Sequence, residues 1–306
     1  MKLAAIFPGQ GAQKPGMGRD FYDNFSRARE MFDEADDILG EKFSDTIFNG
    51  ETKTLALTRN SQLAIFITSV AIFEVLKEQV PEIEFVMMGG LSLGEYSALY
   101  ASGRMSFPNA LKLVARRGQL MQEAAQNNPG TMAAVIGVGA DQIMPYLSNG
   151  VNIANLNCPG QIVISGTVPG IDQTVAALKS AGIGRIVPLD VSGAFHSNLM
   201  ESARLGLSSD INDVTLEKSN IDLVMNVPGD FVSEESEIRE NLIAQVVGSV
   251  KWESCVRAMM GAGAQCFVEI GPGKTLNGMN RKIGAGKTIS LEMVSHLDSL
   301  LIEVAK

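Results

Sequence analysis

Hydrophobic positions in the first part of the chain follow two kinds of spacing. Short apolar runs at Leu3–Phe7 and Phe85–Gly89 are typical of buried strands. Elsewhere apolar residues recur at steps of three and four, which predicts helices over 20–39, 61–79 and 108–126. Because strands alternate with helices, we expect an α/β fold with a parallel sheet covered on both faces.

The pattern changes near Pro129. The runs that follow predict strands over 131–138, 151–156, 161–166 and 185–191, with helices over 140–148 and 169–182. This order, β-α-β-β-α-β, is the split-βαβ arrangement, and it indicates a small subdomain inserted at 129–197. The helical pattern resumes at about 198, so 1–128 and 198–306 are expected to form a larger subdomain. The last clear strand is Cys266–Ile270.

Length and composition suit one large domain or two unequal ones. The chain has 306 residues, of which 45% are hydrophobic. Its longest apolar runs, such as Leu63–Val70, end well before the roughly 20 residues needed to span a membrane. The apolar stretch at Leu3–Phe7 is shorter than the ~7–15 residues of a signal-peptide core. We therefore expect the first buried strand of a cytoplasmic protein.

Charge and cysteine count exclude several classes of function. The net charge of −9 disfavours nucleic acid binding, and an acidic protein partner would need a local basic patch. Cys158, Cys255 and Cys266 are scattered and odd in number, which argues against disulfides or a zinc site. With only two histidines, a His-rich metal site is excluded, and no metal is expected.

One motif carries specific chemistry. Gly90–Gly94 (GLSLG) matches the G-x-S-x-G nucleophile elbow, and it lies between an apolar run and a helical run at Glu95–Ala101. The two glycines allow a tight turn that exposes the Ser92 hydroxyl at the end of a strand. The helix that follows points N–H groups at the same place, where an oxyanion can be held. The motif predicts that Ser92 is a nucleophile; a chance match of small residues is the alternative.

A serine nucleophile needs a base, and the chain offers two candidates. His196 follows the last strand of the inserted subdomain, where clefts commonly form. His296 lies near the C-terminus, where an exposed polar residue is the simpler interpretation. We favour His196. An α/β-hydrolase esterase that uses Ser92 and His296 remains the alternative, together with a non-catalytic binding domain of the same fold.

Six motifs, in this order along the chain, resemble one known family. They are Pro8–Gln13 (PGQGAQ), Gly90–Leu99 (GLSLGEYSAL), Arg117-Gly118, Asn155–Gln161 (NLNCPGQ), Gly193–His196 (GAFH) and Glu269–Lys274 (EIGPGK). Together they are similar to the malonyl-CoA:acyl carrier protein transacylases of bacterial type II fatty acid synthesis. The resemblance covers essentially the whole chain. It implies a hydrolase-like parallel-sheet core with an inserted ferredoxin-like small subdomain.

The resemblance also implies a mechanism. Ser92 would take the malonyl group from malonyl-CoA, with His196 as the base, and pass it to the phosphopantetheine thiol of acyl carrier protein. The backbone N–H groups of Gln10 and Leu93 would form the oxyanion hole. The backbone carbonyl of Gln245, rather than a carboxylate, would orient the histidine.

Further residues would bind the substrate. Arg117 would hold the free malonyl carboxylate, because a planar guanidinium matches a carboxylate at two points. Phe195 would crowd a 2-methyl group and so disfavour methylmalonyl-CoA. Asn157 and Gln161 would line the site in supporting roles, and Gln62 matches a glutamine often found near it.

Two further expectations follow from the resemblance. Acyl carrier proteins are acidic, so docking would need a basic patch, and the candidates are Lys274, Arg281, Lys282 and Lys287. A solvated surface loop is the alternative for 281–287. The Gly-rich turns after Phe7 and Ile270 match no complete nucleotide motif, so no cofactor is expected. Many members of the family have His where this chain has Leu91, and we expect activity to survive this change.

Overall fold

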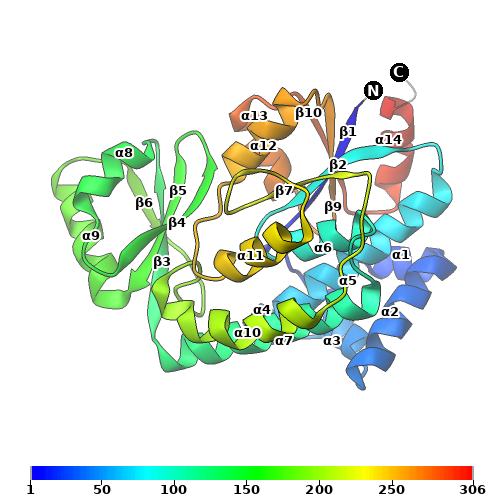
Figure 1. Ribbon diagram of the computed structural model, residues 1–306, viewed down its shortest axis with the longest axis horizontal. Coiled ribbons are helices and arrows are strands. Elements are labelled where there is room, and N and C mark those ends of the chain that lie inside the picture. The colour runs from blue at the N-terminus through cyan, green and yellow to red at the C-terminus, as the bar shows by residue number, and fades with distance from the viewer. Residues whose placement is uncertain (1, 305–306) are drawn as a thin grey trace.

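The computed structural model describes residues 2–304 and contains two separate sheets (Figure 1). The larger sheet has the strand order β10-β9-β1-β2-β7-β8. Its first five strands in this order are parallel, and β8 pairs antiparallel with β7. Its strands are β1 (Leu3–Phe7), β2 (Phe85–Gly90), β7 (Asp222–Met225), β8 (Asp230–Val232), β9 (Cys266–Ile270) and β10 (Lys287–Leu291).

Helices surround this sheet. They are α1 (Arg19–Asn24), α2 (Ser26–Leu39), α3 (Phe43–Asn49), α4 (Thr52–Ala56), α5 (Thr58–Gln79), α6 (Gly94–Ala101), α7 (Phe107–Asn127), α10 (Glu201–Asp213), α11 (Glu235–Gln245), α12 (Trp252–Gly261), α13 (Thr275–Ile283) and α14 (Ser295–Val304). A short 3₁₀ turn, η2 (Asn198–Met200), precedes α10.

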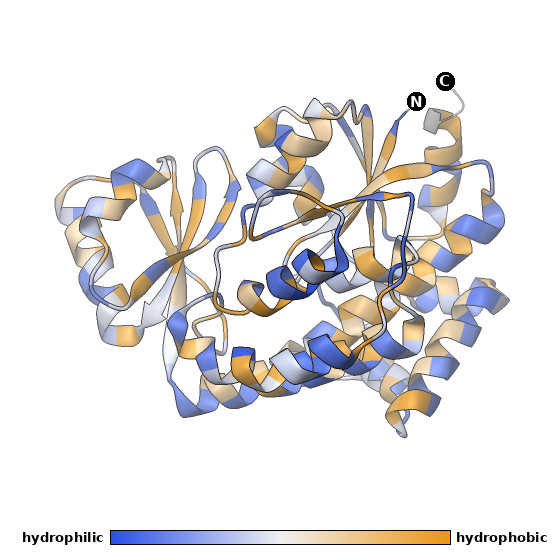
Figure 2. Ribbon diagram, viewed as in Figure 1, coloured by the Kyte–Doolittle hydropathy of each residue, from blue (hydrophilic) through white to orange (hydrophobic). Residues whose placement is uncertain are grey.

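Both faces of the large sheet are buried, as its central strand shows. Leu3, Ala5 and Phe7 of β1 join the core formed with α2, α5, α6 and α7. Ala4 and Ile6 point the other way, into the core formed with α12 and α13. Because every residue of β1 is buried, the strand is apolar throughout, and the hydropathy colouring shows the central strands mostly in the hydrophobic colour (Figure 2).

Helix α5 is the principal core helix. By length and composition alone it could cross a membrane, but 94% of its apolar window is buried inside the protein. Its Phe66 ring stacks on Phe107 of α7 with ring centroids 5.9 Å apart. Its apolar character is therefore accounted for by packing against α2, α6 and α7.

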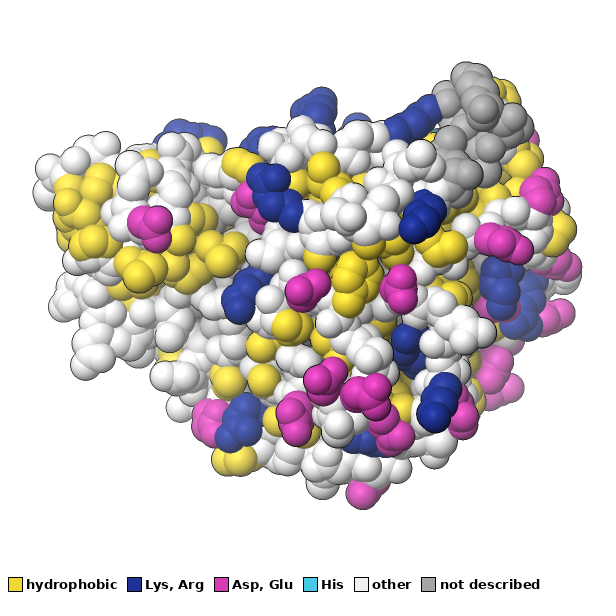
Figure 3. Space-filling model, turned by 45° about the horizontal axis from the view of Figure 1, so that its top comes forward, with side chains coloured by type: hydrophobic (Ala, Val, Ile, Leu, Met, Phe, Trp, Pro, Cys, Tyr) yellow, Lys and Arg dark blue, Asp and Glu magenta, His cyan; other side chains and the backbone are white. Residues whose placement is uncertain are grey.

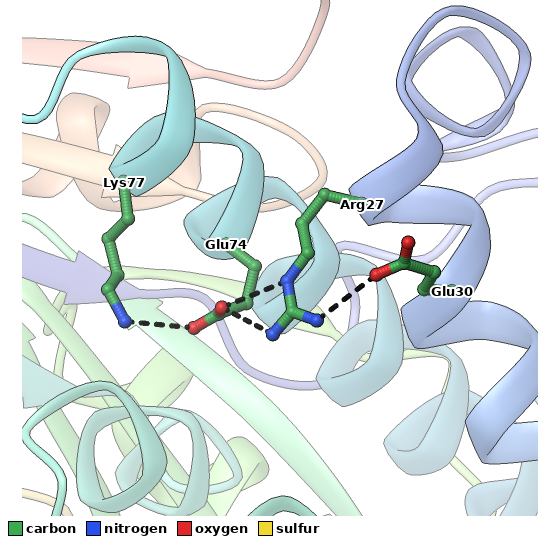
Figure 4. A network of polar contacts seen from close by, with 4 residues as sticks. All are labelled: Arg27, Glu30, Glu74 and Lys77. Carbon is green, nitrogen blue, oxygen red and sulfur yellow. Dashed lines mark hydrogen bonds and ion pairs between the residues drawn. The ribbon is translucent and has the colours of Figure 1, made fainter.

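An ion-pair network joins α5 to α2 (Figure 4). Glu74 accepts from Arg27 (Nη2–Oε2, 2.7 Å) and from Lys77 (Nζ–Oε1, 3.3 Å), and Arg27 also reaches Glu30. Burial alone would raise the pKa of the Glu74 carboxyl, but Arg27 and Lys77 hold that pKa below its ordinary value. The buried carboxylate is therefore compensated on both sides.

The smaller sheet is antiparallel and has the order β4-β5-β3-β6. Its elements are β3 (Gly130–Ile136), α8 (Ala140–Ile143), η1 (Met144–Tyr146), β4 (Val151–Cys158), β5 (Gln161–Thr167), α9 (Val168–Ser180) and β6 (Arg185–Pro188). Residues such as Val135, Ile164 and Leu178 form a core of its own on one face. Met132 and Val163 on the other face join the main core.

Backbone hydrogen bonds connect the two sheets. The N–H of Leu156 in β4 donates to the Val250 carbonyl, and the Val250 N–H donates to the Ala154 carbonyl, both at 2.8 Å. Val250 follows α11, which packs against α10. The smaller sheet is therefore bonded to the segment that leaves α11.

The structure corrects several sequence-based boundaries. The helix expected over 20–39 is two helices, because Phe25 has an extended backbone (φ −126°, ψ 128°). The helix expected over 140–148 is the short α8 followed by a 3₁₀ turn. Strands β7, β8 and β10 were not predicted, because they are short and β8 and β10 are only partly buried. The basic segment at 281–287 is not a single loop, since it spans the end of α13 and the start of β10.

Candidate active site

The nucleophile elbow adopts the expected turn between β2 and α6. Ser92 has φ 52°, a left-handed conformation that is uncommon outside glycine. A Cβ on Gly90 would lie 2.0 Å from the Gly94 carbonyl carbon, and a Cβ on Gly94 would lie 2.2 Å from the Phe7 carbonyl oxygen. Both glycines are therefore required by the close approach of the backbone.

Three side chains meet at the Ser92 hydroxyl. Its Oγ lies 2.9 Å from His196 Nε2 and accepts a hydrogen bond from Arg117 Nη2 at 3.0 Å. His196 also has a left-handed backbone, with φ 56°. Four residues earlier, the Ser192 hydroxyl bonds to Thr58 at the start of α5 at 2.8 Å, which anchors the segment carrying the histidine.

The hydrogen bonds of His196 define its tautomer. Its Nδ1 lies 2.8 Å from the Gln245 carbonyl oxygen, which can only accept. Nδ1 therefore carries the proton, and Nε2 accepts from Ser92. Burial, together with the charge of Arg117, lowers the pKa of His196 to about 4. The ring is thus neutral near pH 7 and able to take a proton from Ser92.

Arg117 is a buried cation, with 1% of its surface exposed. Its Nη1 donates to Gln62 Oε1 at 2.6 Å, and its Nη2 donates to Gln245 Oε1 at 3.0 Å. Burial lowers the pKa of its guanidinium. Within residues 2–304 no carboxylate forms an ion pair with it. An unpaired buried charge is unfavourable, so the site is suited to an anionic ligand.

Asn226 holds the elbow and was not predicted. Its Oδ1 accepts from the Ser92 N–H at 2.6 Å, and its Nδ2 donates to the Gly90 carbonyl at 2.8 Å. Asn226 directly follows β7, which sequence analysis did not identify. Because β7 has only four residues, the sequence before Asn226 gave no usable signal for it.

A cavity of 440 Å³ opens over Ser92, between the two sheets. Its apolar walls include Met121, Met132 and Leu189. The predicted site residues that line it are Gln10, Ser92, Leu93, Arg117, Asn157, Phe195 and His196. The remaining predicted residues, Gln62, Gln161 and Gln245, do not line it; Gln62 and Gln245 are fully buried, and Gln161 is partly exposed.

Two residues that line this cavity, Gln10 and Leu93, have backbone donors that are unpaired within residues 2–304. For the N–H groups of Gln10 and Leu93, no acceptor is found among the residues that the structure describes. Asn157 Oδ1 is buried and also lacks a partner in that part of the chain. Gln161 instead accepts from Cys158 Sγ at 3.4 Å. Unpaired donors beside a nucleophile are suited to a developing oxyanion.

His296 is not part of this site. It lies on α14, where its Nδ1 accepts from the Glu292 N–H at 3.3 Å, and it does not line the cavity. The histidine beside Ser92 is His196. The geometry therefore does not support an esterase that pairs Ser92 with His296.

The chain matches the family described as the acyl transferase domain over residues 5–286. It is 40% identical over 297 residues to the malonyl CoA-acyl carrier protein transacylase of Bacillus subtilis (strain 168), covering 95% of this chain and 93% of that protein. It is 39% identical over 305 residues to the protein of the same name from Staphylococcus aureus (strain MRSA252), covering 98% and 97%.

Solved structures agree with these relatives. The malonyl CoA-acyl carrier protein transacylase of Clostridium perfringens superposes with a TM-score of 0.94 at 35% identity, covering 100% of this chain and 98% of that one. A malonyl-transacylase in complex with its type II polyketide synthase acyl-carrier protein, PlMCAT:AntF, gives 0.95 at 32% identity, covering 99% and 100%. Fold and site thus define an acyl transferase. Within that class, the chain belongs to the malonyl CoA-acyl carrier protein transacylase family.

Proposed function

We propose that this protein transfers a malonyl group from malonyl-CoA to the phosphopantetheine thiol of acyl carrier protein, for fatty acid synthesis in the cytoplasm. The observation that carries the proposal is the meeting of Ser92, His196 and Arg117 at one cavity. It combines a nucleophile, its base and a cation for the free carboxylate. The names of the relatives support the same reaction.

In the first half-reaction Ser92 Oγ attacks the thioester carbonyl, and its proton passes to His196 Nε2. Negative charge develops on the carbonyl oxygen, next to the unpaired N–H groups of Gln10 and Leu93. When the intermediate collapses, the C–S bond breaks and the imidazolium of His196 protonates the departing CoA thiolate. Malonyl-serine and free CoA remain.

The second half-reaction runs through the same groups. The phosphopantetheine thiol enters where CoA left, and His196 removes its proton. The sulfur attacks the malonyl ester, the C–Oγ bond breaks, and Ser92 Oγ recovers a proton from His196. The Gln245 carbonyl holds Nδ1 in both directions, so the same tautomer is restored after each step.

The free carboxylate of the malonyl group binds Arg117 in this proposal. Arg117 Nη2 already reaches Ser92 Oγ at 3.0 Å, so a carboxylate bound there holds its thioester close to the nucleophile. An acetyl group would leave the buried cation unpaired and would be disfavoured. Phe195 lines the same cavity and would crowd a 2-methyl group.

Acyl carrier protein would dock on the basic patch, defined as Lys274, Arg281, Lys282 and Lys287, all of which are exposed. The patch adjoins the cavity, because Thr275 and Met279 of the same helix line it. In Figure 3, several Lys and Arg side chains lie on the upper part of the surface, where few Asp and Glu side chains are seen. Lower down and to the right, Asp and Glu side chains are more numerous and lie among further Lys and Arg side chains.

Charge reversal of Arg281 and Lys282 to Glu tests this docking surface. Transfer to acyl carrier protein should slow, while acylation by malonyl-CoA should not change. Equal changes in both half-reactions would exclude this docking surface.

We also propose the finer fold assignment. The order β4-β5-β3-β6 supports a ferredoxin-like small subdomain at 129–197. The parallel sheet with its elbow supports a hydrolase-like subdomain formed by 1–128 and 198–306.

The test of the reaction is the intact mass of the protein after brief mixing with malonyl-CoA or acetyl-CoA, repeated with Ser92→Ala. A malonyl-sized adduct that needs malonyl-CoA and Ser92 is expected. If the folded wild-type protein gives no adduct with either donor, the proposal is wrong.

A further inference from the structure

Glu95 lies in the first turn of α6, three residues after Ser92, and only 1% of it is exposed. Its two oxygens accept hydrogen bonds from different parts of the chain. Oε1 accepts from the Asn226 N–H at 2.5 Å, and Oε2 accepts from Gln245 Nε2. One carboxylate therefore joins the elbow helix to the ends of β7 and α11.

This contact is one of three that orient the Gln245 amide. Gln245 Nε2 donates to Glu95 Oε2 and to the Ser92 carbonyl, and its Oε1 accepts from Arg117. The guanidinium can only donate and the Ser92 carbonyl can only accept, and Glu95 adds a second acceptor on the side of the NH₂ group. If the amide were flipped, the NH₂ group of Gln245 would face the N–H groups of Arg117, and both groups are donors.

The second contact reaches the nucleophile. Glu95 holds the Asn226 backbone, and the Asn226 side chain bonds to the Ser92 N–H and the Gly90 carbonyl. Loss of Glu95 would remove one of the contacts that hold Asn226, the residue that bonds to Gly90 and Ser92 of the elbow turn.

The surroundings of Glu95 also change its pKa. Within residues 2–304 Glu95 forms no ion pair with a lysine or arginine. The charge of Arg117 lowers the Glu95 pKa, and Glu95 in turn raises the pKa of Tyr96 and Cys255. Burial raises the pKa of Glu95 to about 8, while the Asn226 N–H and the charge of Arg117 act in the opposite direction. With this pKa the Glu95 carboxyl is mostly protonated at pH 7, and its two oxygens still accept from Asn226 and Gln245. Arg117, on the far side of the Gln245 amide, favours the ionised form.

We infer that Glu95 is a positioning residue for acyl transfer: together with the Ser92 carbonyl it holds the Gln245 amide that faces Arg117, and through Asn226 it holds the turn of Ser92. The inference rests on the proposed function for its choice of acyl donors. If Glu95 has this role, the rate of Ser92 acylation and the preference for malonyl-CoA over acetyl-CoA both depend on Glu95. Its side chain touches neither the substrate nor the Ser92 oxygen.

Glu95→Gln tests the inference, because it keeps the shape and removes one acceptor. Asp36→Asn is the matched control. Asp36 lies on α2, is also buried, and accepts a hydrogen bond from the backbone N–H of Ser44 at 2.8 Å. The rate of Ser92 malonylation should fall roughly 10- to 100-fold in Glu95→Gln, as misplaced catalytic groups do. The malonyl-to-acetyl ratio should fall as well, and Asp36→Asn should change neither by more than about twofold.

A second probe separates this inference from the proposed reaction. An alkyl fluorophosphonate labels an activated serine by forming a bond from Oγ to phosphorus with loss of fluoride, and it needs no malonyl recognition. If wild type is labelled at Ser92 but takes no malonyl group, the proposed function fails and the labelling rates still test Glu95. Slower labelling of Glu95→Gln supports the inference, and wild-type rates of labelling and acylation would overturn it.

If Glu95→Gln does not fold, Glu95→Asp is measured instead. Aspartate keeps the charge but is one methylene shorter, so it cannot reach both donors. The same losses in labelling and in the malonyl-to-acetyl ratio are expected, and a variant with wild-type values would contradict the inference.

Discussion

Ser92 and His196 meet at 2.9 Å, and both have left-handed backbones. Among residues 2–304 they are the two non-glycine positions with positive φ. Such conformations cost of order 1–3 kcal/mol each and persist where the surroundings fix them. Here Asn226 bonds to the Ser92 backbone and Gln245 bonds to the His196 ring. The two strained non-glycine backbones are thus those of the two residues whose side chains meet.

His196→Ala should reduce malonylation of Ser92 by roughly 10²- to 10⁴-fold, because the hydroxyl loses its base. His296→Ala is the control and should keep wild-type rates, since His296 lies outside the cavity. Stopped-flow mixing followed by intact-mass analysis measures both. The opposite ranking of the two variants would restore the esterase alternative.

His196 should make stability depend on pH. Its pKa falls from 6.5 to about 4 on folding, so the unfolded chain binds more protons between these values. The contribution of His196 to the free energy of unfolding is fully present above pH 6.5. It is lost as pH falls through 4, a change of about 3 kcal/mol. Urea unfolding of wild type and His196→Gln between pH 7.5 and 4 isolates it. If the free energy of unfolding depends on pH in the same way in both proteins, the lowered pKa of His196 is wrong.

Gly94→Ala should unfold the elbow or abolish labelling of Ser92, because the new Cβ would lie 2.2 Å from the Phe7 carbonyl oxygen. Gly278→Ala is the control within α13, where no atom lies within 4 Å of an added Cβ. It should stabilise the protein by about 1 kcal/mol through helix propensity. Thermal unfolding measures both, and a tolerated Gly94→Ala would mean that the turn can relax.

Arg117→Ala should slow malonylation by roughly 10²-fold or more, because removing one partner of a buried charge pair costs about 2–5 kcal/mol. The rate of acetylation by acetyl-CoA should fall far less, so the ratio of malonylation to acetylation rates should decrease strongly. Arg116→Ala is the control, since Arg116 is half-exposed and pairs with Asp210 at 3.4 Å. Rates of acyl-enzyme formation with each donor decide the matter, and an unchanged ratio would remove Arg117 from carboxylate recognition.

Glu74→Gln should destabilise the protein by about 1 kcal/mol, because it removes the charge that bonds to both Arg27 and Lys77. Glu30→Gln should change the free energy of unfolding by less than about 0.5 kcal/mol, since Glu30 is 63% exposed. Urea denaturation measures both values. Equal effects would show that burial of Glu74 adds nothing to the network.

Local sequence was sufficient where a feature depends on neighbours in the chain. The elbow could be predicted because the glycines at 90 and 94 and the strand before them lie within ten residues. The β-α-β-β-α-β order of elements could be predicted for the same reason, and the structure has β3, α8, β4, β5, α9 and β6 in this order along the chain.

Features that depend on distant contacts were not predictable. Glu95 and Asn226 are 131 residues apart, and Glu95 and Gln245 are 150 apart, so no spacing rule connects them. The strand before Asn226 has only four residues and gives too little periodicity to identify. The role of Gln245 came from resemblance to a family, and its side-chain bonds required the structure.

The backbone bonds between β4 and Val250 have a mechanical consequence. Val250 follows within a few residues of Gln245, whose carbonyl holds His196. A change in the angle between the two sheets would therefore be transmitted through a short, hydrogen-bonded segment to the imidazole. A displacement of β4 would therefore act on the same short segment whose Gln245 carbonyl accepts from His196 Nδ1.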